Sequence, residues 1–132
     1  MSYDYWLKQT PENPLFPKLL WSKPENKLGS GKLLIFGGSN SGFAKVAGAF
    51  QSAQKWNAGQ IRILLPDVLQ RTLKLLLPEA GFLPSNPSGG FSNLGFGELI
   101  SEAQWADGVL VPGDLGHNSE TEILIEKFAN KY

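Results

Sequence analysis

Two glycine-rich segments carry the residues that are best suited to binding a ligand. Residues 37–42 read GGSNSG, and residues 112–116 read PGDLG. Glycine lets backbone N–H groups approach an anion, and the N-terminus of a following helix adds a modest attraction. The alternative is that these glycines only form tight turns between a strand and a helix. The predicted ligand-binding residues are Gly37, Gly38, Ser39, Asn40, Gly113, Leu115 and Gly116.

Few residues of this chain could carry out nucleophilic or acid–base catalysis. Ser39 and Ser41 are the candidate nucleophiles, and the single histidine, His117, is their candidate base. A triad would also need Asp114 or Glu120 to orient the imidazole. The spacing of these residues does not require such an arrangement, so we predict no catalytic residue.

Metal and thiol chemistry have little support in the composition. The chain has no cysteine and one histidine, which excludes a disulfide framework, a cysteine-ligated zinc and a multi-histidine metal site within one chain. Two carboxylate pairs, Asp107 with Asp114 and Glu98 with Glu102, could in principle bind magnesium or transfer protons, but a position on the surface is the ordinary explanation for them. We therefore predict no metal site.

The first glycine-rich loop does not match the common phosphate-binding motifs. Gly37 and Gly42 have the spacing of a Walker A motif, but Phe43 and Ala44 follow where that motif needs Lys and Ser or Thr. This excludes a P-loop NTPase. Ser39 also replaces the middle glycine of the dinucleotide fingerprint, which leaves a variant Rossmann site with Asp67 as its ribose ligand as a weaker alternative; a helix N-cap also explains Asp67.

Length and charge limit the possible partners. A chain of 132 residues suits a single domain, and its 12 basic and 12 acidic residues balance without any basic block. This pattern argues against nucleic acid and anionic membranes and favours a small molecule or another protein. No stretch has the roughly 20 apolar residues that span a bilayer, and no signal peptide is evident. We expect a soluble, cytoplasmic protein.

Residues 1–31 and residues 32–132 differ in character. The first segment combines four prolines with Trp6, Phe16 and Trp21, which suits neither a long helix nor a disordered tail. We predict an N-terminal arm that runs over the domain surface and anchors its aromatic side chains there. Such an arm could also cover a pocket or a partner.

Residues 32–132 alternate between strand and helix patterns, which predicts the elements that position the two loops. Buried strands are expected at 33–36, 61–65 and 108–111, and helices at 43–56, 68–76, 97–106 and 119–132. Gly59 is the expected left-handed cap of the first helix, while Asp67 and Ser119 are the expected N-caps of the second and last. Residues 78–95 show no period and are expected to form a lid or a mobile loop.

This alternation predicts an α/β fold with three layers, in which a mainly parallel sheet has helices on both faces. Ligands of such sheets bind outside the carboxyl ends of the strands. Two of the predicted strands end in the glycine-rich loops, so we expect both loops to face one crevice.

An ordered set of motifs resembles the ADP/ATP-dependent NAD(P)H-hydrate dehydratases of the ribokinase-like, carbohydrate-kinase superfamily. The set comprises KLLIFGGS at 32–39, NAG at 57–59, Pro66, PE at 78–79 and ADGVLVPGDLG at 106–116. The resemblance implies that the chain binds ADP or ATP, with Mg²⁺ as a further candidate ligand. It also implies a hydro-lyase reaction, in which a hydrated nicotinamide ring is dehydrated. The chain departs from the pattern at Gly42, Lys45 and the additional Asp114.

The resemblance covers only the N-terminal half of the ribokinase-like fold. In that superfamily the second half carries a Gly-x-Gly-Asp anion hole, the catalytic aspartate and most of the nucleotide site. We therefore expect a truncated or short relative that is inactive as a single chain, and a last strand with an exposed apolar edge. Such an edge favours a homo-oligomer or a partner chain. A non-catalytic oligomerisation or nucleotide-binding module, or half of a sugar or vitamin kinase, is the alternative.

Overall fold

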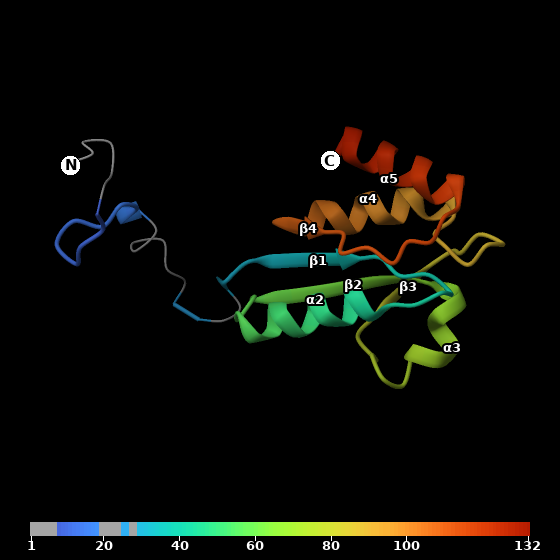
Figure 1. The fold of residues 1–132 in the computed structure, drawn as a ribbon, viewed down its shortest axis with the longest axis horizontal. Helices are drawn as coiled ribbons and strands as arrows, with labels where there is room; N and C mark the ends of the chain where they lie inside the picture. The colour runs from blue at the N-terminus through green and yellow to red at the C-terminus, as the bar shows by residue number, and fades with distance from the viewer. Residues whose placement is uncertain (1–7, 19–24, 27–28) are drawn as a thin grey trace, which may run out of the picture.

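Four parallel strands form the centre of the domain, in the order β3-β2-β1-β4 (Figure 1). The computed structural model describes residues 8–18, 25–26 and 29–132. The elements from β1 onward are β1 (Lys32–Phe36), α2 (Ala44–Lys55), β2 (Gln60–Pro66), the 3₁₀ turn η2 (Asp67–Leu69), α3 (Gln70–Leu73), β3 (Gly81–Leu83), the 3₁₀ turn η3 (Asn93–Gly95), α4 (Phe96–Trp105), β4 (Gly108–Leu110) and α5 (Ser119–Lys131).

The helices lie on both faces of the sheet, which confirms the predicted three-layer α/β fold (Figure 1). Successive strand residues point to opposite faces, so Leu34 and Phe36 of β1 contact α4 and α5, while Ile35 packs against α2 and α3. The core beside α2 and α3 consists of Ile35, Val46, Ile63, Leu65, Leu69 and Leu73. Both faces of the sheet are therefore buried, as expected for parallel strands.

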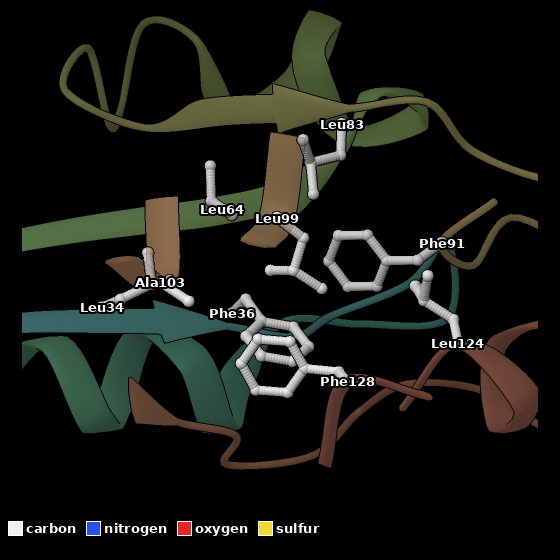
Figure 2. Close-up of a cluster of buried hydrophobic side chains, with 9 residues drawn as sticks. All are labelled: Leu34, Phe36, Leu64, Leu83, Phe91, Leu99, Ala103, Leu124 and Phe128. Atoms are coloured by element: carbon white, nitrogen blue, oxygen red, sulfur yellow. The ribbon is translucent and has the colours of Figure 1, made fainter. Parts of the chain in front are cut away.

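Three phenylalanine side chains pack among leucines and Ala103 in the core on the α4 and α5 face (Figure 2). The ring of Phe36 meets the rings of Phe91 and Phe128 edge to face, with centroid distances of 5.9 and 5.2 Å. Such pairs add about 0.5–1.5 kcal/mol each to the free energy gained by burying their area. Phe91 comes from the long connection between β3 and α4, so this core fixes that connection to the sheet.

The prediction for residues 78–95 was wrong. This segment contains β3, which pairs with β2 from Leu64↔Gly81 to Pro66↔Leu83, and it continues into a packed loop rather than a lid or a mobile segment. Leu83 and Phe91 are 1% and 0% exposed. A strand of three residues is too short to show a period, and its identity comes from pairing with a distant strand.

Three predicted helix caps were also wrong. Asn57, with φ of 60°, adopts the left-handed conformation that was expected of Gly59. Asp67 does not cap its turn, because its carboxylate accepts hydrogen bonds from the backbone N–H and the hydroxyl of Ser85. The N-cap of α5 is Asn118, one residue before the expected Ser119.

One expected helix length needs correction as well. The helix expected at 68–76 is only a 3₁₀ turn and the four residues of α3, which end at Leu73 instead of Leu76. The helices α2, α4 and α5 lie within one or two residues of their predicted bounds. Amphipathic helices of three turns are clear in the sequence, whereas a single turn carries too few residues to show a stripe.

The N-terminal arm is only partly covered by the structure. Thr10 and Asn13 form a turn through reciprocal backbone hydrogen bonds. Phe16 is 66% exposed, so this side chain is not anchored on the domain as expected. Trp6 and Trp21 lie outside the described residues. The boundary between arm and domain at residue 31 stays a prediction.

Within the described part of the chain, none of the helices combines the length and the apolar character that crossing a membrane requires.

Candidate functional site

The strand order places a topological switch point between β1 and β4 (Figure 1). From β1 the chain moves outward through β2 to β3, then returns past β1 to add β4 on the other side. Connections from the carboxyl ends of two such strands diverge and leave a crevice in which ligands of parallel sheets commonly bind. The loops 37–42 and 112–118 are the segments that leave β1 and β4 at this point.

The two glycine-rich loops lie against each other. The N–H of Gly38 donates to the carbonyl oxygen of Gly113, with an N–O distance of 3.1 Å. A Cβ at Gly37 would lie only 2.7 Å from that same carbonyl oxygen, so the approach depends on a residue without a side chain. Leu115 packs on the core from the second loop. The two loops that the sequence singled out are thus in direct contact.

A third loop, 84–92, also joins this region, and its role was not predicted. The N–H of Asn40 donates to the carbonyl oxygen of Gly89 at 2.8 Å. Gly89 has φ of 81°, and a Cβ there would lie 2.2 Å from Cγ of Asn40. The SGG sequence at 88–90 could have indicated a close backbone approach, but the strand before it was missed, so its position at the carboxyl end of the sheet was not deduced.

Asn86 holds this third loop in place. Its side chain is buried, and Oδ1 accepts hydrogen bonds from the N–H groups of Ser88 and Gly90 at 3.0 and 3.1 Å. Its Nδ2 lies within hydrogen-bonding distance of Asn118 Oδ1 and Thr121 Oγ1, at 3.3 and 3.2 Å. One buried amide therefore connects the loop after β3 to the start of α5.

A polar pocket of about 190 Å³ lies between the first and second loops. Its lining consists of Ser39, Ser41, Gly42, Asp114, Gly116 and His117. Only some of the predicted site residues line this pocket. Ser39 and Gly116 line the pocket, Gly37 and Gly38 are buried among the packed loops, Asn40 is exposed and faces the third loop, and Leu115 belongs to the core. Gly113 lies against the side chain of Lys45.

The backbone donors of the first loop all have acceptors within the chain. Each of the six N–H groups from residue 37 to residue 42 donates a hydrogen bond. In chain order the acceptors are Leu64 O, Gly113 O, Gly42 O, Gly89 O, Ser39 Oγ and Ser39 O. These six groups are therefore satisfied within the chain, and none of them is left to hold an anion.

Asp114 caps helix α2 from the neighbouring loop. Its carboxylate accepts a hydrogen bond from the N–H of Lys45 at 2.9 Å, in the first turn of a helix whose own N-cap, Phe43, provides no side-chain cap. Asp114 has φ of 58°, a left-handed conformation that aspartate adopts more readily than most residues. A negative charge therefore already occupies the N-terminus of α2.

The candidate catalytic residues gather without forming a triad. Ser39, Ser41, Asp114 and His117 line one pocket, and Oγ of Ser39 accepts from the N–H of Ser41 at 3.2 Å. Within residues 29–132, no hydrogen bond joins His117 to a serine hydroxyl or a carboxylate. Glu120, the other candidate acid, accepts from Ser92 and Asn93 instead. The described residues also contain no group of three or more His, Cys, Asp or Glu that could hold a metal.

Comparison of the sequence with models of known protein families found no match, and comparison with curated proteins found none either. The resemblance to the hydrate dehydratases therefore stays a prediction, carried by the motifs at 32–39 and 106–116.

Proposed function

We propose that this chain binds a nucleotide-type ligand at the switch point between β1 and β4, as a relative of the NAD(P)H-hydrate dehydratases. The observation that carries the proposal is the contact between the two glycine-rich loops around a pocket lined by hydroxyl, imidazole and carboxylate groups. A switch-point crevice is the common ligand site of parallel α/β sheets. We propose binding and assign no catalytic residue.

The size and chemistry of the pocket favour one ring of such a ligand. Its volume of about 190 Å³ is smaller than the roughly 300–1,000 Å³ of pockets that enclose drug-sized molecules. Ser41, Asp114 and His117 supply groups that hydrogen-bond to hydroxyl and amide groups, as found on a ribose or a hydrated nicotinamide ring. ADP or ATP with Mg²⁺ stays part of the proposal through the resemblance alone, because the donors of this crevice do not suit a phosphate.

A thermal-shift panel tests this proposal. ADP, ATP, NADH and hydrated NADPH are each added separately to the full chain. A sugar is tested in a further sample, because the alternative is that the chain is half of a sugar kinase. A true ligand raises the free energy of unfolding by about 2.7 kcal/mol when it is present at roughly 100 times its Kd. The proposal fails if none of the nucleotides stabilises the protein.

A matched pair of serine variants locates the site. Ser41→Ala removes a hydroxyl from the pocket wall, whereas Ser101→Ala removes one from the exposed surface of α4. We expect only Ser41→Ala to reduce the ligand-induced shift, while both variants unfold at the same temperature as the wild type without ligand. Equal shifts in both variants would place the ligand elsewhere.

A second candidate function, an assembly module, is favoured by the edge of the sheet. β4 pairs with β1 alone among the described strands, and its Leu110 is 41% exposed. Exposed strand edges pair readily with other chains. We propose that a second copy or a partner chain covers this edge. Light scattering coupled to size-exclusion chromatography measures the oligomeric state. A monodisperse monomer at high concentration would contradict a homo-oligomer.

A further inference from the structure

The N-terminus of α2 points to the chemical class of ligand that the pocket accepts. The helix has 12 residues and begins directly after the first glycine-rich loop, a position at which many parallel α/β proteins bind phosphate. The partial positive charge there attracts anions. In this chain the carboxylate of Asp114 occupies that position, with its Oδ2 atom 2.9 Å from the N–H of Lys45.

The surrounding donors give a phosphate little to bind. The six N–H groups of residues 37–42 already donate within the chain. The ammonium group of Lys45 extends toward Gly113, where it would lie 3.4 Å from an added Cβ, and Lys45 is not part of the pocket lining. Asp114 itself lines the pocket, so an entering phosphate would meet a like charge at close range.

We infer that Asp114 is the specificity-determining residue of this pocket, and that it excludes phosphate and admits an uncharged or cationic group that carries hydroxyl or amide donors. The identity of the ligand rests on the proposed function. If the ligand is a nucleotide, the pocket holds its nicotinamide or ribose end, and the phosphates of the nucleotide lie outside the pocket. Ligand donors would then hydrogen-bond to the second oxygen of the carboxylate, because Oδ2 already accepts from Lys45.

Two variants of Asp114 separate its charge from its role as a cap. Asp114→Asn keeps an acceptor for Lys45 and tolerates the left-handed backbone, so it removes only the charge. Asp114→Gly also tolerates the positive φ, and it frees the N–H of Lys45 as well as removing the charge. Glu98→Gln is the matched control, because Glu98 is an exposed carboxylate of α4 that lines a different pocket.

The probe is inorganic phosphate, followed through the backbone amide signals of Ser41, Gly42 and Lys45 in a ¹H–¹⁵N correlation spectrum of the full chain. We expect no saturable shift in the wild type or in Glu98→Gln. Asp114→Gly should bind phosphate at least about tenfold more tightly than the wild type, and Asp114→Asn should show a smaller gain. If Asp114→Gly does not fold, Asp114→Asn alone decides.

The inference is overturned if the wild type already shows saturable phosphate binding at these amides, or if neither folded variant binds phosphate more tightly than the wild type. A parallel titration of the wild type with a nicotinamide nucleoside, which carries no phosphate, tests the proposed function separately. Without a nucleoside shift the proposed ligand is wrong, while the phosphate comparison still shows whether Asp114 selects by charge.

Discussion

Gly37→Ala is the substitution that most directly tests how the two glycine-rich loops are joined. Gly37 does not need a left-handed backbone, so alanine is tolerated by its own φ and the effect must come from contacts. The new Cβ would lie 2.7 Å from the carbonyl oxygen of Gly113 and 3.1 Å from Cγ2 of Val46. The first distance is too short for a carbon and a backbone oxygen, so one of the two loops must move.

The expected cost follows from what must move. Overpacking a buried position destabilises a protein by about 1–3 kcal/mol. Displacing the loops also weakens the hydrogen bond of 3.1 Å from Gly38 to Gly113, which contributes about 1 kcal/mol. Alanine also lowers the conformational entropy of the unfolded chain relative to glycine, which offsets about 0.4–1 kcal/mol of this destabilisation. We therefore expect Gly37→Ala to lower the free energy of unfolding by about 1–3 kcal/mol.

Gly48→Ala is the matched control for this experiment. Gly48 lies in the middle of α2, and a Cβ there would have no atom within 4 Å. Alanine in a helix interior is more stable than glycine by about 0.5–1 kcal/mol, so this variant should be more stable than the wild type. Urea unfolding followed by far-UV circular dichroism measures both variants. A Gly37→Ala protein that unfolds at the same urea concentration as the wild type, or later, would refute the predicted contact between the loops.

Two further substitutions test the third loop and the surface. Asn86→Ala should lower the free energy of unfolding by about 2–4 kcal/mol, because the substitution leaves buried partners such as Thr121 Oγ1 without their donor. Urea unfolding measures this loss. A loss below about 1 kcal/mol, roughly the contribution of one hydrogen bond, would contradict the role of Asn86. Arg62→Met should cost only about 1 kcal/mol, because the ion pair with Glu102 is partly exposed. The Arg62 guanidinium lies 3.9 Å from the ring centroid of Trp105, so the tryptophan fluorescence should change even though stability hardly does.

Elements with a clear period were predictable from the sequence alone. The apolar runs that became β1 and β2 and the stripe at Val46, Phe50 and Ala53 are local signals, because a buried face needs apolar residues at a fixed spacing. The strand β3 gave no such signal. Its three residues become a strand through pairing with β2, which is a tertiary interaction.

The site was predictable only in part, for a related reason. The glycine-rich loops stood out through their composition, and strand alternation was enough to bring them to one edge of the sheet. The roles of Asp114 and Asn86 were not predictable, since each is set by an acceptor or donor from another segment. Asp67 shows the same limit, because its carboxylate serves Ser85 across the chain rather than its own turn.

The strand order also determines when the pocket can form during synthesis of the chain. β1, α2 and β2 are contiguous and can pair early, but β4 must wait for the rest of the domain before it adds to the other edge of β1. Asp107, which bonds to the N–H of Lys32, lies 75 residues further along the chain. Contacts across such separations form slowly because a long loop must be closed first. We therefore expect the pocket between the loops to be one of the last features to form. Until β4 is in place, the edge of β1 opposite β2 can pair with other chains.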